Sequence, residues 1–155
     1  MTTNPPAGPR SVGVRLITST CTHGFELDSR YVEEFWTPIA GPTAILLLRT
    51  ISRIPLQLDN PTPAAIDLEL LAEMLGLRFN GGKNSTIVRT IHRLARFDLA
   101  INEGTDTDFN IAVPNRIRPV ETHRQNHWSQ ILVAGHDIAL SLHHQQLAQR
   151  AGATS

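Results

Sequence analysis

Two short helical segments within residues 67–97 constrain the fold more than any other part of the chain. The first begins at Asp67, a residue type that caps helix N-termini, and stops at Gly76, which suits the left-handed position after a helix. The second follows Ser85, another capping residue, and runs to about residue 97. The intervening "LRFNGGKN" contains two glycines, so the pattern predicts two helices joined by a glycine-containing turn.

The second segment predicts an amphipathic helix. At about 100° per residue, its apolar side chains gather on one side: Ile87, Val88, Ile91, Leu94 and Ala95. The opposite side is polar and cationic, and carries Thr86, Arg89, Thr90, Arg93 and Arg96. The apolar side predicts packing against a core, which leaves the cationic side free to meet a partner.

Charge is distributed unevenly along the chain. Five cations and no acid lie between residues 78 and 96, namely Arg78, Lys83, Arg89, Arg93 and Arg96. Residues 78–118 carry a net charge of +3, residues 1–77 carry −3, and the whole chain is neutral. A neutral total argues against a protein that coats nucleic acid without specificity, but it is compatible with a local basic face.

Length and composition indicate a globular protein. The 155 residues are 41% hydrophobic, which suits a single domain with its own core. No apolar run is long enough to span a bilayer, and the single cysteine, Cys21, cannot form an internal disulfide. Residues 1–10 contain three prolines and no apolar core of a secretory signal, so we expect a flexible arm there. These features predict a cytoplasmic protein that does not contact membranes.

The remaining elements follow from caps, prolines and alternation. Residues 12–16 alternate as a strand does, and Asp28 and Ser29 precede a helix over "RYVEEFW". Pro42 suits the first position of an apolar core helix, "PTAILLLRTISRI". The β-prone runs 99–101 and 109–113 flank a polar turn, which predicts a β-hairpin, and the tail from about residue 122 predicts one or two helices, with Ser129 as an internal cap.

The fold class expected from these elements is mainly α with a small β-hairpin, in a domain over residues 11–155. The order of "AAIDLELLAEMLGL", "NSTIVRTIHRLARFDLA" and "INEGTDTDFNIAV" resembles the winged helix-turn-helix superfamily over about residues 42–113. An N-terminal strand and helix and a C-terminal helical extension, about 119–150, would flank that core. The turn "RFNGGKN" is longer than the three or four residues of a compact helix-turn-helix.

The resemblance implies a DNA-binding transcriptional regulator with no enzymatic activity and no cofactor. A helix of this kind fits the major groove, where arginine pairs with guanine and asparagine with adenine. Arg89 and Arg93 are the leading base readers, and Thr86 and Thr90 assist them. Asn84 and Ser85 stand at the N-terminal end of the same helix, while Arg78, Lys83 and Arg96 would hold phosphates.

Two other functions remain open from the sequence. The basic face could meet an acidic protein, and the acidic wing residues Glu103, Asp106 and Asp108 weigh against insertion of the wing into DNA. A small metalloprotein built on histidines is the weaker alternative, because His123 and His127 share a helical spacing but complete no ligand set. The C-terminal helix could equally form a homodimer or pack back on its own domain.

Overall fold

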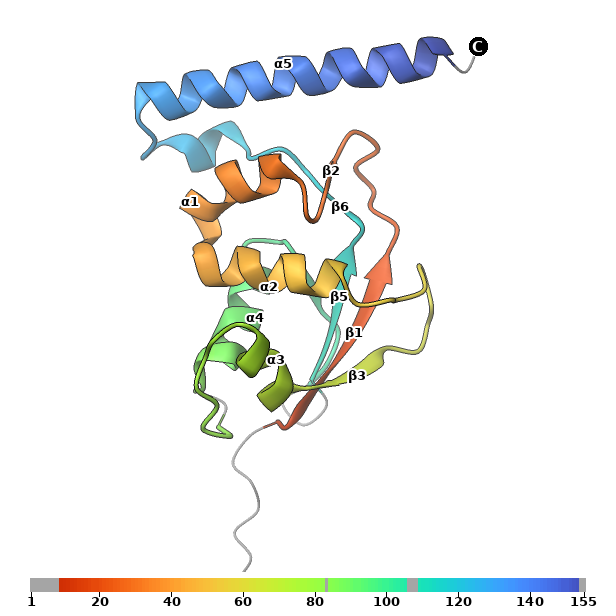
Figure 1. Cartoon of the computed structure of the whole chain (residues 1–155), viewed down its shortest axis with the longest axis vertical. Coiled ribbons are helices and arrows are strands. Elements are labelled where there is room, and N and C mark those ends of the chain that lie inside the picture. Colours follow the sequence, from red (N-terminus) through yellow and green to blue (C-terminus); the bar gives the residue numbers. More distant parts are fainter. Residues whose placement is uncertain (1–8, 83, 106–108, 154–155) are drawn as a thin grey trace, which may run out of the picture.

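A computed structural model describes residues 9–82, 84–105 and 109–153 of the chain (Figure 1). Within these ranges it combines five α-helices with a small mixed sheet. The predicted flexible arm, residues 1–10, falls almost entirely outside the described residues, as do Lys83, Asp106 and Asp108. No described helix is long and apolar enough to cross a membrane.

The first helical segment is continuous but changes type at a proline. A π-helical turn, η1 (Val32–Trp36), leads directly into α1 (Thr37–Ala40), and Ser29 caps the start by accepting a hydrogen bond from the backbone N–H of Val32. Pro38 has no N–H to donate to the Glu33 carbonyl one π-turn earlier. The hydroxyl of Thr37 donates to that carbonyl instead. The helix therefore passes through Pro38 with a change of type and ends at Ala40, with Gly41 as its C-cap.

Three further helices begin where the sequence predicts, although the Ser85 side chain makes no capping hydrogen bond to α4. α2 (Pro42–Ser52) begins with Pro42 at its first turn and is largely buried, α3 (Leu68–Met74) begins after Asp67, and α4 (Thr86–Arg96) begins after Ser85. The carboxylate of Asp67 accepts a hydrogen bond from the Leu70 N–H at 3.1 Å. Gly76 has φ +70°, which only glycine adopts without strain, and α3 ends just before it.

The sheet has the strand order β3-β1-β5-β4. Its central strand, β1 (Ser11–Ile17), pairs antiparallel with β3 (Ala64–Asp67) and parallel with β5 (Asn110–Pro114), which pairs antiparallel with β4 (Ile101–Asn102). A separate two-stranded pair joins β2 (Phe25–Glu26) to β6 (Arg116–Ile117). Val12 and Val14 on β1 are fully buried, as the alternation along that strand predicts.

The β-structure is larger than the expected small hairpin. The hairpin itself is confirmed, because Ile101 pairs with Ala112 and Asn102 with Ile111. β1 is also confirmed, but β3 is an element that we expected to be loop and helix. Its sequence, "AAID", has little intrinsic strand preference, and the strand exists because it pairs with β1. A mixed α/β description therefore fits the chain better than a mainly α one.

The long C-terminal helix, α5 (Gln130–Ala153), lies across one end of the molecule (Figure 1). A single turn of 3₁₀-helix, η2 (Thr122–Gln125), precedes it, and Ser129 caps it by accepting a hydrogen bond from the Leu132 N–H. One face of α5 is docked through His136, which is only 2% exposed, with partly buried Leu132, Ala139 and Leu140 beside it. The helix thus packs back on its own domain, while its other face stays exposed.

Candidate nucleic-acid interface

The apolar side of α4 anchors this helix in the core. Ile87, Val88, Ile91 and Leu94 are buried, and the helix contacts α2, α3 and β4. This packing turns the opposite side outward, where the exposed residues are Thr86, Arg89, His92, Arg93 and Arg96. The predicted amphipathic helix with a cationic outer face is confirmed as a structural feature.

The cationic face of α4 forms one wall of an open groove of about 580 Å³. The other wall is the corner between α1 and α2, residues 40–44. The Arg93 guanidinium bridges the two walls, because its Nε donates a hydrogen bond to the Ala40 carbonyl. No acidic residue is among the described residues that line this groove. The arginines of the groove, Arg89, Arg93 and Arg96, therefore all lie on the α4 wall, and no acid opposes them there.

One aromatic ring organises the cations at the C-terminal end of α4. The Phe97 ring lies 5.6 Å from the guanidinium carbon of Arg93, 6.0 Å from that of Arg96 and 5.5 Å from that of Arg124. Cations at such distances from a ring are attracted by its quadrupole. Arg124 comes from the segment before α5, so a cation distant in sequence joins the end of the α4 face.

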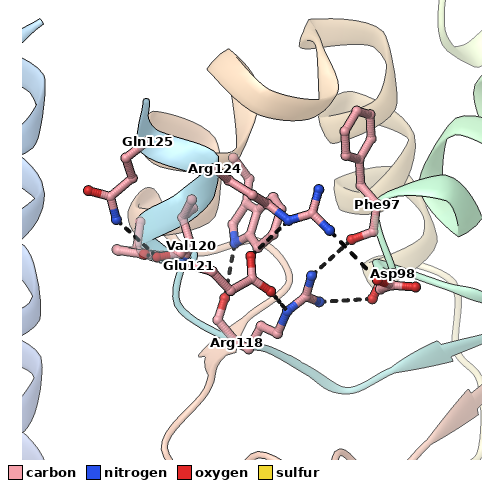
Figure 2. Close-up of polar contacts among 9 residues, drawn as sticks. Phe97, Asp98, Arg118, Val120, Glu121, Arg124 and Gln125 are labelled. Carbon is pink, nitrogen blue, oxygen red and sulfur yellow. Dashed lines mark hydrogen bonds and ion pairs between the residues drawn. The ribbon is translucent and has the colours of Figure 1, made fainter. Parts of the chain in front are cut away.

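A network of polar contacts fixes the C-terminus of α4 (Figure 2). Arg118 donates hydrogen bonds to the carbonyls of Phe97 and Asp98, each at 3.0 Å, and forms an ion pair with Glu121 at 2.5 Å. These carbonyls stand at the negative end of the helix dipole, where a cation is favourable. The segment after β6 therefore acts as a cap that holds α4 in a fixed orientation.

Glu121 connects Arg118 and Arg124 within the same network. Its two carboxylate oxygens accept hydrogen bonds from Arg118 and Arg124. Burial raises the pKa of the Glu121 carboxyl, but the hydrogen bond from Arg118 and the charges of both arginines outweigh that effect and lower the pKa below its usual value. Glu121 thus stays ionised and keeps both guanidinium groups in place.

Two of the predicted DNA-contacting residues do not reach the exposed face. Thr90 is 6% exposed, and its hydroxyl donates to the Thr86 carbonyl at 2.7 Å. Ser85 is also 6% exposed, and its hydroxyl is buried without a hydrogen-bond partner among the described residues. The expected exposure of both side chains is wrong, because the edge of α4 that carries them is covered by its neighbours.

Four of the other predicted residues line the groove, namely Thr86, Arg89, Arg93 and Arg96, and the largely buried Thr90 also borders it. Asn84 and Arg78 are exposed but are not among the lining residues. Lys83 lies outside the described residues. The sequence missed His92, which also lines the groove and packs its ring 5.2 Å from Phe109. Its position next to Arg93 and opposite Leu94 on the helical wheel was the available signal.

The acidic hairpin of β4 and β5 is partly neutralised within the fold. Both guanidinium contacts of Arg15, on β1, go to the Glu103 carboxylate, at 2.5 and 2.7 Å. This hydrogen bond lowers the pKa of Glu103 below its usual value. Because Arg15 offsets its charge, Glu103 opposes an approaching phosphate less than the sequence suggests. Asp106 and Asp108, the two acids between β4 and β5 that follow Glu103, lie outside the described residues.

The histidines do not gather into a metal centre in the part of the chain that the structure describes. His136 is buried in a polar contact with Tyr31, and His143 stacks on Phe25 with ring centroids 4.0 Å apart. The half-buried Cys21 remains a free thiol.

Comparisons with family models, with curated proteins and with solved structures find no match to this chain. The case for a function therefore rests on the geometry and charge of the groove beside α4.

Proposed function

We propose that this chain binds double-stranded DNA through the exposed face of α4 and acts as a transcriptional regulator. The observation that carries the proposal is the acid-free groove lined by Arg89, Arg93 and Arg96. Organised cations on one helical face are the electrostatic footprint of a nucleic-acid-binding protein, even when the net charge is zero.

The order of elements supports a winged helix-turn-helix core for this activity. α2, α3 and α4 are followed by the hairpin of β4 and β5, as the sequence resemblance implies. α4 is 11 residues long, about 16 Å, and the diameter of an α-helix with its side chains, about 10–12 Å, matches the width of a major groove. β1 and α5 are additions around this proposed core.

The contacts of the arginines divide the roles within the proposed interface. Arg89 is exposed and its side chain makes no hydrogen bond or ion pair with another described residue, so it leads as the base reader. Arg93 is held by the Ala40 carbonyl and stands in the groove, where a phosphate of the backbone would lie. Arg96 and the exposed Arg78 would hold neighbouring phosphates.

A matched pair of arginine substitutions tests this assignment. Arg89→Ala removes one cation from the α4 face and is expected to weaken binding to a selected duplex by roughly 1–3 kcal/mol. Arg30→Ala removes the same charge from an exposed ion pair with Glu34 that takes no part in the groove, and should leave affinity unchanged. Equal loss in both variants, or none in either, would refute the assignment of α4 as the reading helix.

The proposed regulator is a cytoplasmic homodimer. A dimer lets two reading helices contact two half-sites, and α5 is the element that could join the copies because one of its faces is exposed. Binding of an acidic protein to the same groove is the competing outcome, and it would appear as an interaction that duplex DNA does not displace.

A further inference from the structure

An apolar stripe runs along the exposed side of α5. Ile131 is 86% exposed, Ile138 62% and Leu142 54%, so three large apolar side chains of one helix lie in solvent. They recur at intervals of seven and four residues, the spacing that keeps side chains on one helical face. Ala134 and the half-exposed Gly135 lie between the first two. We call these five residues the α5 stripe.

The α5 stripe lies largely outside the side that docks on the domain, although Gly135, Ile138 and Leu142 also border a groove that α5 shares with the segment between residues 24 and 35. His136, Ala139 and Leu140 form the docked side, and they lie on the opposite half of the helical wheel from Ala134 and Ile138. The stripe is therefore not part of the core of its own domain. A continuous row of exposed apolar residues is typical of a surface that another molecule covers.

The charge of α5 favours a second copy of this chain as the partner that covers the α5 stripe. From residue 130 to 149 the helix carries one acid, Asp137, and no lysine or arginine. α5 itself therefore offers a strongly charged partner almost nothing to pair with, and the charged groups beside the stripe, such as Arg30, Glu34 and Arg116, belong to other segments. A second α5 requires no compensating charge, because each copy offers the same nearly uncharged apolar row.

The sizes of the side chains decide between the two ways of pairing. In a parallel pair in register, Gly135 would face Gly135 and leave a void, and Gln145 would face Gln145. In an antiparallel pair centred on Ile138, Leu142 of each copy instead meets Ala134 and Gly135 of the other. Filling the space beside a small residue with a leucine removes the cost of a cavity. Antiparallel helix dipoles also attract one another.

We propose that two copies of this chain associate through their α5 stripes in an antiparallel pair centred on Ile138. This inference rests on the dimer named in the proposed function and adds its geometry, and it does not depend on DNA binding. No residue of α5 lines the groove beside α4, so the proposed pairing uses a different surface from the proposed DNA contact.

Sedimentation velocity on the full chain tests the existence of the pair. The parent protein should sediment as a dimer, and Ile138→Glu should sediment as a monomer at the same concentration with an unchanged circular dichroism spectrum. His144→Glu places the same charge at an exposed position of α5 outside the stripe and should remain dimeric. A monomeric parent, or a dimer that survives Ile138→Glu, overturns the proposal.

Disulfide trapping tests the orientation separately. In a Cys21→Ser background, a mixture of Ile131→Cys and Gln145→Cys chains should form the mixed disulfide on oxidation, because these positions face each other only in the antiparallel pair. Ile131→Cys alone should not cross-link to itself. A dimer that yields only the Ile131→Cys self-cross-link would contradict the antiparallel geometry while leaving the proposed dimer and the proposed DNA binding intact.

Discussion

The helices α4 and α5 both pack against the same core, but they are attached to it by different contacts. α4 buries a row of four apolar side chains, and Arg118 caps its C-terminus. α5 has one fully buried anchor, His136, and otherwise only partly covered side chains. The contrast indicates that α4 belongs to the cooperative unit of the fold, so its cationic face has a fixed geometry, whereas α5 should undock without unfolding the rest.

The largest effect is expected from a truncation under α4. Leu94 is fully buried, and Leu94→Ala should lower the free energy of unfolding by about 2–5 kcal/mol through lost burial and the cavity left behind. Chemical denaturation followed by circular dichroism measures it. The matched change Leu70→Ala, at an exposed leucine of α3, should alter stability by only about 0.5 kcal/mol. Similar values for both variants would show that α4 is not part of the cooperative core.

A smaller loss is expected when the cap of α4 is removed. Arg118→Ala takes away the hydrogen bonds to the Phe97 and Asp98 carbonyls and leaves Glu121 with one fewer cation. The cost should be about 1–3 kcal/mol, because bonds to charged groups are lost at a partly buried site. Amide exchange should then quicken in the last turn of α4 and stay unchanged in α5. Faster amide exchange in α5 alone would contradict the assignment of Arg118 as the cap of α4.

The smallest effect concerns the docking of α5 and depends on pH. Tyr31 accepts a hydrogen bond from the Val120 N–H, and its hydroxyl shares a second hydrogen bond of 2.6 Å with His136 Nε2, in which the imidazole tautomer decides the donor. Burial lowers the pKa of His136 below its ordinary 6.5, although Asp137 opposes the shift. Docking should therefore be complete above pH 6.5 and weaken as the pH falls below it, because the undocked state takes up the proton first.

Fluorescence of Trp128, whose ring centroid lies 5.5 Å from that of His136, reports on this docking. The signal should change as the pH is lowered from about 8 to about 5, the range in which histidine titrates. His136→Gln, whose amide can still hydrogen-bond the Tyr31 hydroxyl but does not titrate, should abolish the change. An identical pH profile in that variant would assign the transition to another group.

Local signals in the sequence predicted the elements that local chemistry controls. Pro42, Asp67 and Gly76 mark helix ends through their own backbone and side-chain preferences, and the structure bears out all three. The two-faced character of α4 follows from its period. These features need no knowledge of distant parts of the chain.

Features that depend on tertiary contacts were missed or misplaced. β3 forms because it pairs with β1. Arg118 caps α4 by donating to the carbonyl of Asp98, which lies 20 residues earlier in the chain. Thr90 was assigned to the outer face because it lies at the polar edge of the helical wheel. The α1–α2 corner covers that edge, and the threonine satisfies its hydroxyl on its own helix.

We propose that the groove beside α4 binds the phosphate backbone of DNA. Its most direct test is the affinity of the full chain for a random-sequence duplex as salt concentration is raised. We predict measurable binding at low salt and a linear fall of log affinity with log salt, through release of counterions, with a smaller slope in Arg96→Ala, which removes a proposed phosphate contact. Absence of binding at low salt, or an affinity that salt does not change, would contradict it.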